Sequence, residues 1–206
     1  MDLEQFIVDR PYLYHLTSKE NFDLIKKDRI LYSANKLFKF CNLDPLQYRI
    51  KRKKHLYIEK KGKKIMIRDQ RPLSEIALAK CLEDGWLCKD YYYYLNDRVF
   101  FWPTLERLNP HFNRYEDEKP LIIRLNTRDV ITLNKNVKFS RLNSGATRPN
   151  AYLGGIAPKR GKNTFVVAPS FQFPIRKVAE VTFDVKCVLP QKVMYSSSPV
   201  GSWKNV

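Results

Sequence analysis

Two polar residues, His15 and Glu180, stand in apolar runs that are typical of β-strands, and both have side chains that can move protons. His15 lies in the alternating run 12–17, directly before a helix-start signal. Its side chain can therefore reach a sheet end where ligands bind, or it is a core histidine bonded to backbone. Glu180 is the only acid in the run 178–183. Burying a carboxylate without partners is costly, so Glu180 is either exposed or placed for chemistry, and alternation alone favours exposure.

Several common catalytic signatures are missing from the sequence. It contains no G-x-G-x-x-G, no Walker loop, no H-E-x-x-H and no G-x-S-x-G. These absences argue against a Rossmann dehydrogenase, a P-loop NTPase, a zincin and a common esterase. The three histidines are scattered and the four cysteines form no C-x-x-C pair, so no metal site is expected and the cysteines are interpreted as core thiols.

The charge balance is strongly basic. The chain has 38 Lys and Arg against 21 Asp and Glu, a net charge of +17. Such a surplus attracts polyanions, and nucleic acid is the leading candidate. Residues 47–71 hold eleven Lys or Arg against two acids, which predicts a basic hairpin turning at Gly62. This run is either a solvated face or a guide for nucleic acid, with Tyr48, Tyr57 and His55 available to stack on bases. The expected nucleic-acid contacts are Lys51, Arg52, Lys53, Lys54, Arg148, Lys159, Arg160 and Lys162.

The periodicity mixes short strands with a few helices and shows no regular βαβ alternation, which predicts an α+β fold. Thr17 and Glu20 have the spacing of a capping box. The predicted helices cover 18–28, 72–83 and 91–94. The predicted strands cover 12–17, 98–102, 121–125, 164–168 and 178–183, with a long loop over 143–163.

The length of 206 residues fits one domain, 1–206, with 47–71 as a basic insert and 194–206 as a C-terminal tail without chemistry. No run approaches about 18 consecutive apolar residues, and the first residues lack the apolar core of a signal peptide. We therefore expect no membrane partner, and a reducing, cytoplasmic location.

Three segments resemble, in the same chain order, parts of the DarT-type DNA ADP-ribosyltransferases. In 14–25, a strand-borne histidine, His15, and a hydroxyl residue precede a helix that starts at an asparagine. Residues 99–103 are similar to that family's central aromatic strand, although its Arg-Ser-Pro continuation is absent here. In 176–183 a basic pair precedes Ala-Glu, and in that family the glutamate, here Glu180, is catalytic.

The resemblance implies an ADP-ribosyltransferase-like split antiparallel β-sheet with flanking helices, whose cleft binds NAD. It implies that Glu180 and Arg68 are catalytic, although either Arg68 or Arg71 can take the position that faces the pyrophosphate or the attacked base. The residues implied in NAD binding are His15, Thr17, Asn21, Arg71 and Phe100.

The expected activity is transfer of ADP-ribose from NAD to a base of DNA or RNA. NAD is consumed as a substrate, and no metal is required. The resemblance also implies a toxin of a toxin–antitoxin or phage-defence system, whose partner would be a separate antitoxin hydrolase or inhibitor. Two alternatives stay open: a protein-modifying ADP-ribosyltransferase, and a nonenzymatic basic nucleic-acid-binding module in which His15 and Glu180 are structural.

Overall fold

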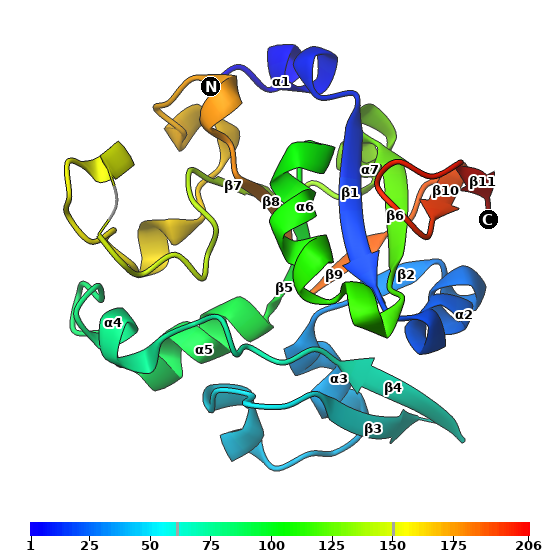
Figure 1. The fold of residues 1–206 in the computed structure, drawn as a ribbon, viewed down its shortest axis with the longest axis horizontal. Helices are drawn as coiled ribbons and strands as arrows, with labels where there is room; N and C mark the ends of the chain where they lie inside the picture. Colours follow the sequence, from blue (N-terminus) through cyan, green and yellow to red (C-terminus); the bar gives the residue numbers. More distant parts are fainter. Residues whose placement is uncertain (61, 150) are drawn as a thin grey trace.

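The computed structural model describes residues 1–60, 62–149 and 151–206 and confirms the α+β class (Figure 1). One antiparallel sheet has the strand order β1-β6-β10-β11. Its central strand β6 (Leu121–Asn126) lies between β1 (Tyr12–Thr17) and β10 (Val193–Ser196), with β11 (Lys204–Asn205) at the edge. Alternation of apolar residues turns one face of β1 and β6 into the core, where Leu13, Ile123 and Leu125 are fully buried.

A second antiparallel sheet has the order β5-β8-β7. Strand β8 (Glu180–Asp184) lies between β5 (Arg98–Phe101) and β7 (Val137–Ser140). The two sheets meet where Tyr14 and Trp102 exchange two backbone hydrogen bonds of 2.9 and 2.8 Å. This bridge sets β1 beside β5 and so brings the histidine strand close to the glutamate strand.

The basic hairpin is confirmed. Strands β3 (Leu56–Lys60) and β4 (Lys63–Ile67) pair antiparallel, and Gly62 takes the positive φ of +71° that a tight turn needs. Its apolar face packs on Phe38 in a small separate core. A further two-stranded pair joins β2 (Ile30–Tyr32) to β9 (Lys186–Val188).

The residues that the structure describes form seven α-helices. They are α1 (Leu3–Asp9), α2 (Lys19–Asp28), α3 (Ala34–Phe40), α4 (Glu75–Ala79), α5 (Cys88–Asn96), α6 (Leu105–Arg114) and α7 (Thr127–Leu133). Figure 1 shows α6 beside β1, with which it is in contact, and α3 beside the hairpin, on which its Phe38 packs.

Three helix predictions need correction. Helix α2 is capped by Ser18, whose hydroxyl accepts a hydrogen bond from the backbone N–H of Asn21, and not by Thr17, which ends the strand. Helix α4 is much shorter than 72–83, because it starts only after the Ser74 cap and ends at Ala79. The tyrosine helix was predicted as 91–94 and forms as the longer α5.

The predicted C-terminal tail, 194–206, is built into the fold, while its lack of chemistry stays a prediction. Residues 193–196 form β10 inside the first sheet, and the ring of Trp203 packs 5.9 Å from the Tyr14 ring and 4.3 Å from the Arg124 guanidinium. The strand predicted over 164–168 is wrong, because only Val166 pairs, through a single bridge to Phe139.

In the described part of the chain, no helix has the length and apolar character needed to cross a membrane.

The C-terminal strands offer a first prediction. Deleting residues 197–206 removes the Trp203 ring and should lower the free energy of unfolding by about 2 kcal/mol and Tm by about 4–8 °C. Deleting 193–206 also strips the β10 edge from β6, so that protein should aggregate. Thermal melts by circular dichroism and soluble yield check both. Equal behaviour of the two deletions would contradict the role of β10.

Candidate functional site

His15 and Glu180 line one cavity of about 500 Å³. His15 comes from β1 and Glu180 from the first position of β8, and the Tyr14–Trp102 bridge brings their sheets together. The size is that of an ordinary small-molecule site. The expectation that the two residues share a cavity is met, while their roles stay predictions.

Glu180 is buried, with 5% of its surface exposed, so the exposed position favoured by alternation was wrong. Its carboxylate accepts hydrogen bonds from Ser144, one from the backbone N–H at 2.9 Å and one from the hydroxyl at 3.3 Å. Burial raises the pKa of Glu180 to about 7, because the Ser144 hydrogen bonds and the charge of Arg160 offset only part of the desolvation. A carboxyl with this pKa exchanges protons readily near neutral pH.

His15 faces the same cavity as a neutral imidazole. Its Nδ1 lies 2.8 Å from the carbonyl oxygen of Phe100, which accepts only if Nδ1 carries the proton. Burial lowers the pKa of His15 to about 4, and the charge of Arg68 adds to this effect. The ring therefore keeps Nε2 as a hydrogen-bond acceptor at neutral pH. Phe100 also lines the cavity, as expected, and its carbonyl fixes the histidine.

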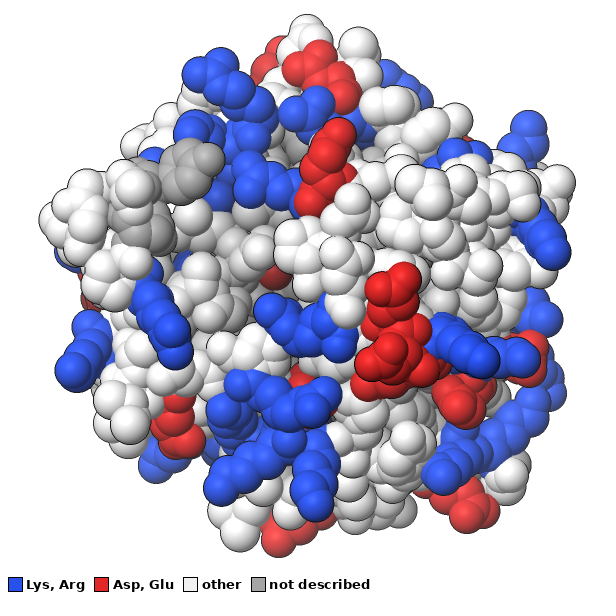
Figure 2. Space-filling model, viewed as in Figure 1, with Lys and Arg blue, Asp and Glu red and all other residues white. Residues whose placement is uncertain are grey.

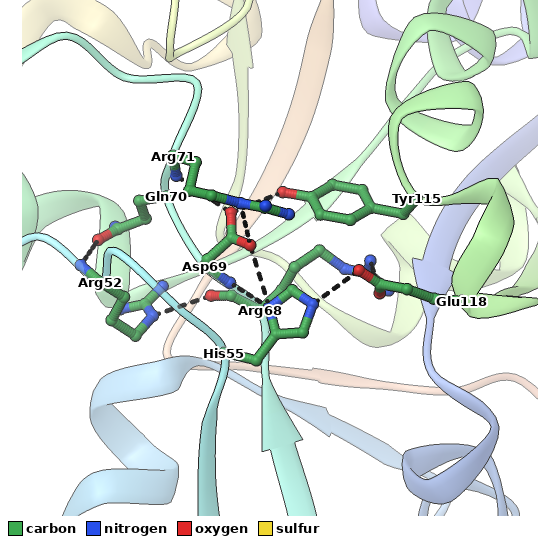
Figure 3. Close-up of polar contacts among 8 residues, drawn as sticks. All are labelled: Arg52, His55, Arg68, Asp69, Gln70, Arg71, Tyr115 and Glu118. Carbon is green, nitrogen blue, oxygen red and sulfur yellow. Dashed lines mark hydrogen bonds and ion pairs between the residues drawn. The ribbon is translucent and has the colours of Figure 1, made fainter.

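Arg68 lies on the wall of the cavity and is positioned by residues after α6 (Figure 3). Its Nη1 donates to Glu118 at 3.0 Å, and its guanidinium lies 4.2 Å over the Tyr115 ring. Glu118 is held in turn by Nε2 of His55 at 2.8 Å. Nη2 of Arg68 is buried and has no hydrogen-bond partner among the described residues. A fixed guanidinium with a spare donor suits an anionic ligand.

Arg71 does not take part in the cavity. Its Nε donates to Asp69 at 2.8 Å, and the Tyr115 hydroxyl donates to the same carboxylate at 2.9 Å (Figure 3). Arg71 is largely exposed and does not line the cavity. Of the two arginines left open by the sequence, Arg68 is the one that lines the cavity, and the expected NAD contact by Arg71 stays a prediction.

Thr17 and Asn21 do not reach the cavity of Glu180. They line a second pocket of about 310 Å³, which shares His15 and Tyr32 with the first. The Asn21 amide donates to the carbonyl of Met66 at 2.7 Å and accepts from its N–H at 2.9 Å. This side chain therefore joins α2 to β4, and its expected role in cofactor binding stays a prediction.

Two of the expected nucleic-acid ligands are structural. Arg160 is 3% exposed and donates to the carbonyls of Asn143 and Ala146, which holds this loop against Glu180. Arg52 lines the cavity and donates to Asn96 at 2.7 Å and to the carbonyl of Arg68 at 2.9 Å. Burial lowers the pKa of Arg52 to about 10, so it remains charged at neutral pH.

The other expected ligands stay at or near the surface. Figure 2 shows Lys and Arg gathered below a central hollow, over the segment between α3 and β3, and acids gathered over the turn 116–118. Lys53, Lys54 and Arg148 are exposed and Lys51 is half-buried. Two of the exposed lysines pair with acids, Lys159 with Glu83 at 3.0 Å and Lys162 with Asp84 at 3.6 Å. Such exposed pairs contribute little stability and leave the side chains free to exchange partners.

Several lining residues escaped the sequence analysis. Tyr32 at the end of β2 lies between the two pockets. Three side chains of helix α6 line the cavity: Arg107, His111 and Arg114. Their spacing of four and three residues places them on one face of a helix, and this pattern could have revealed them in the sequence. His111 had been set aside because the three histidines are far apart in the sequence.

Comparison with known protein families matches residues 11–191 to a family of unknown function, DUF7002. The chain belongs to this family, and the matched region includes both His15 and Glu180. No curated protein and no solved structure matches the chain.

The ion pair that positions Arg68 gives a second prediction. Glu118→Gln should lower the free energy of unfolding by about 1 kcal/mol, because a charge-assisted hydrogen bond in a partly buried position is lost. Glu116→Gln, on the same turn and exposed, is the matched control and should change it by less than about 0.5 kcal/mol. Urea unfolding measures both variants. Equal effects would show that Glu118 does not hold Arg68.

The buried carboxyl gives a third prediction. Because folding raises its pKa from 4.5 to about 7, the folded state binds the proton more tightly, and this stability is lost as pH rises through about 7. Glu180→Gln should therefore stabilise the protein by about 3 kcal/mol at pH 8 and by under about 1 kcal/mol at pH 5. Urea unfolding at both pH values, with the exposed Glu59→Gln as control, checks this. A variant that is destabilised at pH 8 would contradict the burial cost.

Proposed function

We propose that this chain is an NAD-dependent ADP-ribosyltransferase that modifies nucleic acid. The observation that carries the proposal is the cavity that contains a buried carboxyl, Glu180, a neutral histidine, His15, and a positioned arginine, Arg68. The sequence resemblance implies NAD chemistry for Glu180, for His15 and for either Arg68 or Arg71, and the three side chains of the cavity come from three distant parts of the chain. The proposed fold is accordingly a split antiparallel sheet of the ADP-ribosyltransferase kind.

The proposed reaction is a displacement at C1′ of the nicotinamide ribose. The bond from C1′ to the nicotinamide nitrogen breaks, and its electron pair leaves with neutral nicotinamide. A base nitrogen or oxygen of the acceptor forms the new bond to C1′ and gives up its proton to the Glu180 carboxylate, which passes it to solvent. Positive charge builds on the ribose in the transition state, and the carboxylate stabilises it as in glycosidases.

The described contacts support a role for each residue. Nε2 of His15 is free to accept a hydrogen bond from a ribose hydroxyl, because Nδ1 is committed to the Phe100 carbonyl. The spare Nη2 of Arg68 suits a phosphate oxygen of the pyrophosphate. Tyr32 offers an aromatic face between the two pockets, so one dinucleotide can extend from one pocket into the other.

The acceptor proposed is a single-stranded or flipped-out base, because a base atom must leave the stack to enter a cavity. The net charge of +17 and the exposed basic face support a polyanionic acceptor (Figure 2). The proposal includes a cytoplasmic location, where NAD is available and the four free cysteines stay reduced. A toxin role with a separate antitoxin hydrolase or inhibitor is part of the same proposal.

The test is incubation of the protein with NAD and separate pools of single-stranded DNA, duplex DNA, RNA and protein, read by mass spectrometry. A gain of one ADP-ribose unit on a nucleic acid is the expected result, and Glu180→Gln should abolish it. Modification confined to the protein pool would support the protein-modifying alternative. No nicotinamide release, with a Tm unmoved by millimolar NAD, would leave a nonenzymatic nucleic-acid-binding module.

A fourth prediction concerns pH. Because the reaction needs the ionised carboxylate and burial raises the pKa of Glu180 to about 7, kcat/KM for nicotinamide release should rise about tenfold from pH 6 to pH 8. It should level off above that value. Initial rates across this range measure the profile. A rate that is flat from pH 5 to pH 8 would remove Glu180 as the proton acceptor.

A further inference from the structure

One face of α6 carries positive charge that the proposed NAD chemistry does not use. Arg107, His111 and Arg114 all line the large cavity from this helix. Residues spaced by three and four lie on the same side of an α-helix. The two arginines are two helical turns apart, about 10.5 Å along the axis.

This charge has no counter-ion in the described part of the protein. Neither Arg107 nor Arg114 forms an ion pair with a described residue, and both side chains are exposed. Arg107 only donates to the backbone carbonyl of Arg176, at 3.3 Å. Arg68, with its unpartnered Nη2, lies on the same cavity wall. Arg68 is paired with Glu118, whereas Arg107 and Arg114 have no described ion-pair partner, so the uncompensated charge on α6 suits an anionic ligand.

The charges of Arg107 and Arg114 are not among those that shift the pKa of Glu180. The charges of Arg68 and Arg114 act on His111 and, with its burial as the larger cause, lower its pKa to about 3. The charge that acts on Glu180 is instead that of Arg160. One pyrophosphate at Arg68 would leave the two exposed arginines of α6 unpaired.

We infer that Arg107 and Arg114 form an acceptor subsite that binds backbone phosphates of a single nucleic-acid strand. The inference rests on the proposed function for the acceptor's part in the reaction. Two arginines about 10.5 Å apart need negative charges repeated along a chain, which a nucleic-acid strand supplies and a single phosphate does not. Their exposure lets a long strand cross the mouth of the cavity while one base enters toward Glu180.

The test compares the double variant Arg107→Gln/Arg114→Gln with wild type and with Arg128→Gln/Lys135→Gln. The control removes the same charge from exposed residues on and just after α7 that do not line the cavity. Fluorescence anisotropy measures Kd for a short single-stranded DNA, the same sequence in RNA, and an analogue with uncharged methylphosphonate linkages. Nicotinamide release without any strand and ADP-ribose transfer to the strand are measured in parallel, and circular dichroism checks folding.

The α6 variant should raise Kd for the charged strands about tenfold and lower the slope of log K against log salt by about 1.4, because two phosphate contacts are lost. The control variant should change neither Kd nor the salt slope. The analogue with methylphosphonate linkages should bind weakly to wild type and to both double variants. Transfer to the strand should fall at least tenfold more than nicotinamide release.

Equal weakening by the α6 variant and the control would overturn the subsite, because binding would then follow net charge alone. A raised KM for NAD with unchanged strand affinity would also overturn it and assign the arginines to the pyrophosphate. If wild type releases no nicotinamide but the α6 variant still loses strand affinity and salt slope, the proposed function fails and the phosphate site stands.

Discussion

The buried carboxyl of Glu180 is the constraint on which the site depends. A carboxylate taken out of water costs several kcal/mol unless partners replace the lost hydration. Here the partners come from one loop: Ser144 donates both hydrogen bonds, and Arg160 fixes the loop through the carbonyls of Asn143 and Ala146. The compensation is incomplete, which leaves the group with a pKa near 7. Burial of Glu180 therefore lowers the folding stability, and the same burial lets this carboxyl take up and release a proton near neutral pH.

The remaining walls of the cavity follow from how the two sheets meet. The Tyr14–Trp102 bridge sets β1 against β5, so His15 donates to the Phe100 carbonyl and presents the opposite ring nitrogen. Arg68 arrives from the end of the hairpin and is held by Glu118 and Tyr115 from beyond α6. A buried carboxyl and a positioned arginine thus line one cavity, as the proposed reaction of a phosphate-bearing substrate requires.

Part of this arrangement could be predicted from the sequence, because it depends on local patterns. The hairpin at Gly62, the strand that carries His15 and a strand around Glu180 follow from alternation and turn residues, although the strand predicted over 178–183 forms as Glu180–Asp184. Burial of Glu180 could not be predicted, since alternation says nothing about the loop that covers a strand. The roles of Arg52 and Arg160 were missed for a related reason: a basic residue in a charge run can be drawn inward by backbone carbonyls that the sequence does not reveal. The tail became β10 because β6 had an open edge, which only the tertiary fold creates.

The most direct test of the central claim is a crystal structure with a non-hydrolysable carba analogue of NAD. The account predicts that the ring replacing the nicotinamide ribose lies against Glu180 and Nε2 of His15, with a pyrophosphate oxygen on Nη2 of Arg68. An analogue bound elsewhere on the surface, or a cavity that stays empty at millimolar concentration, would contradict the claim that this cavity is an NAD site.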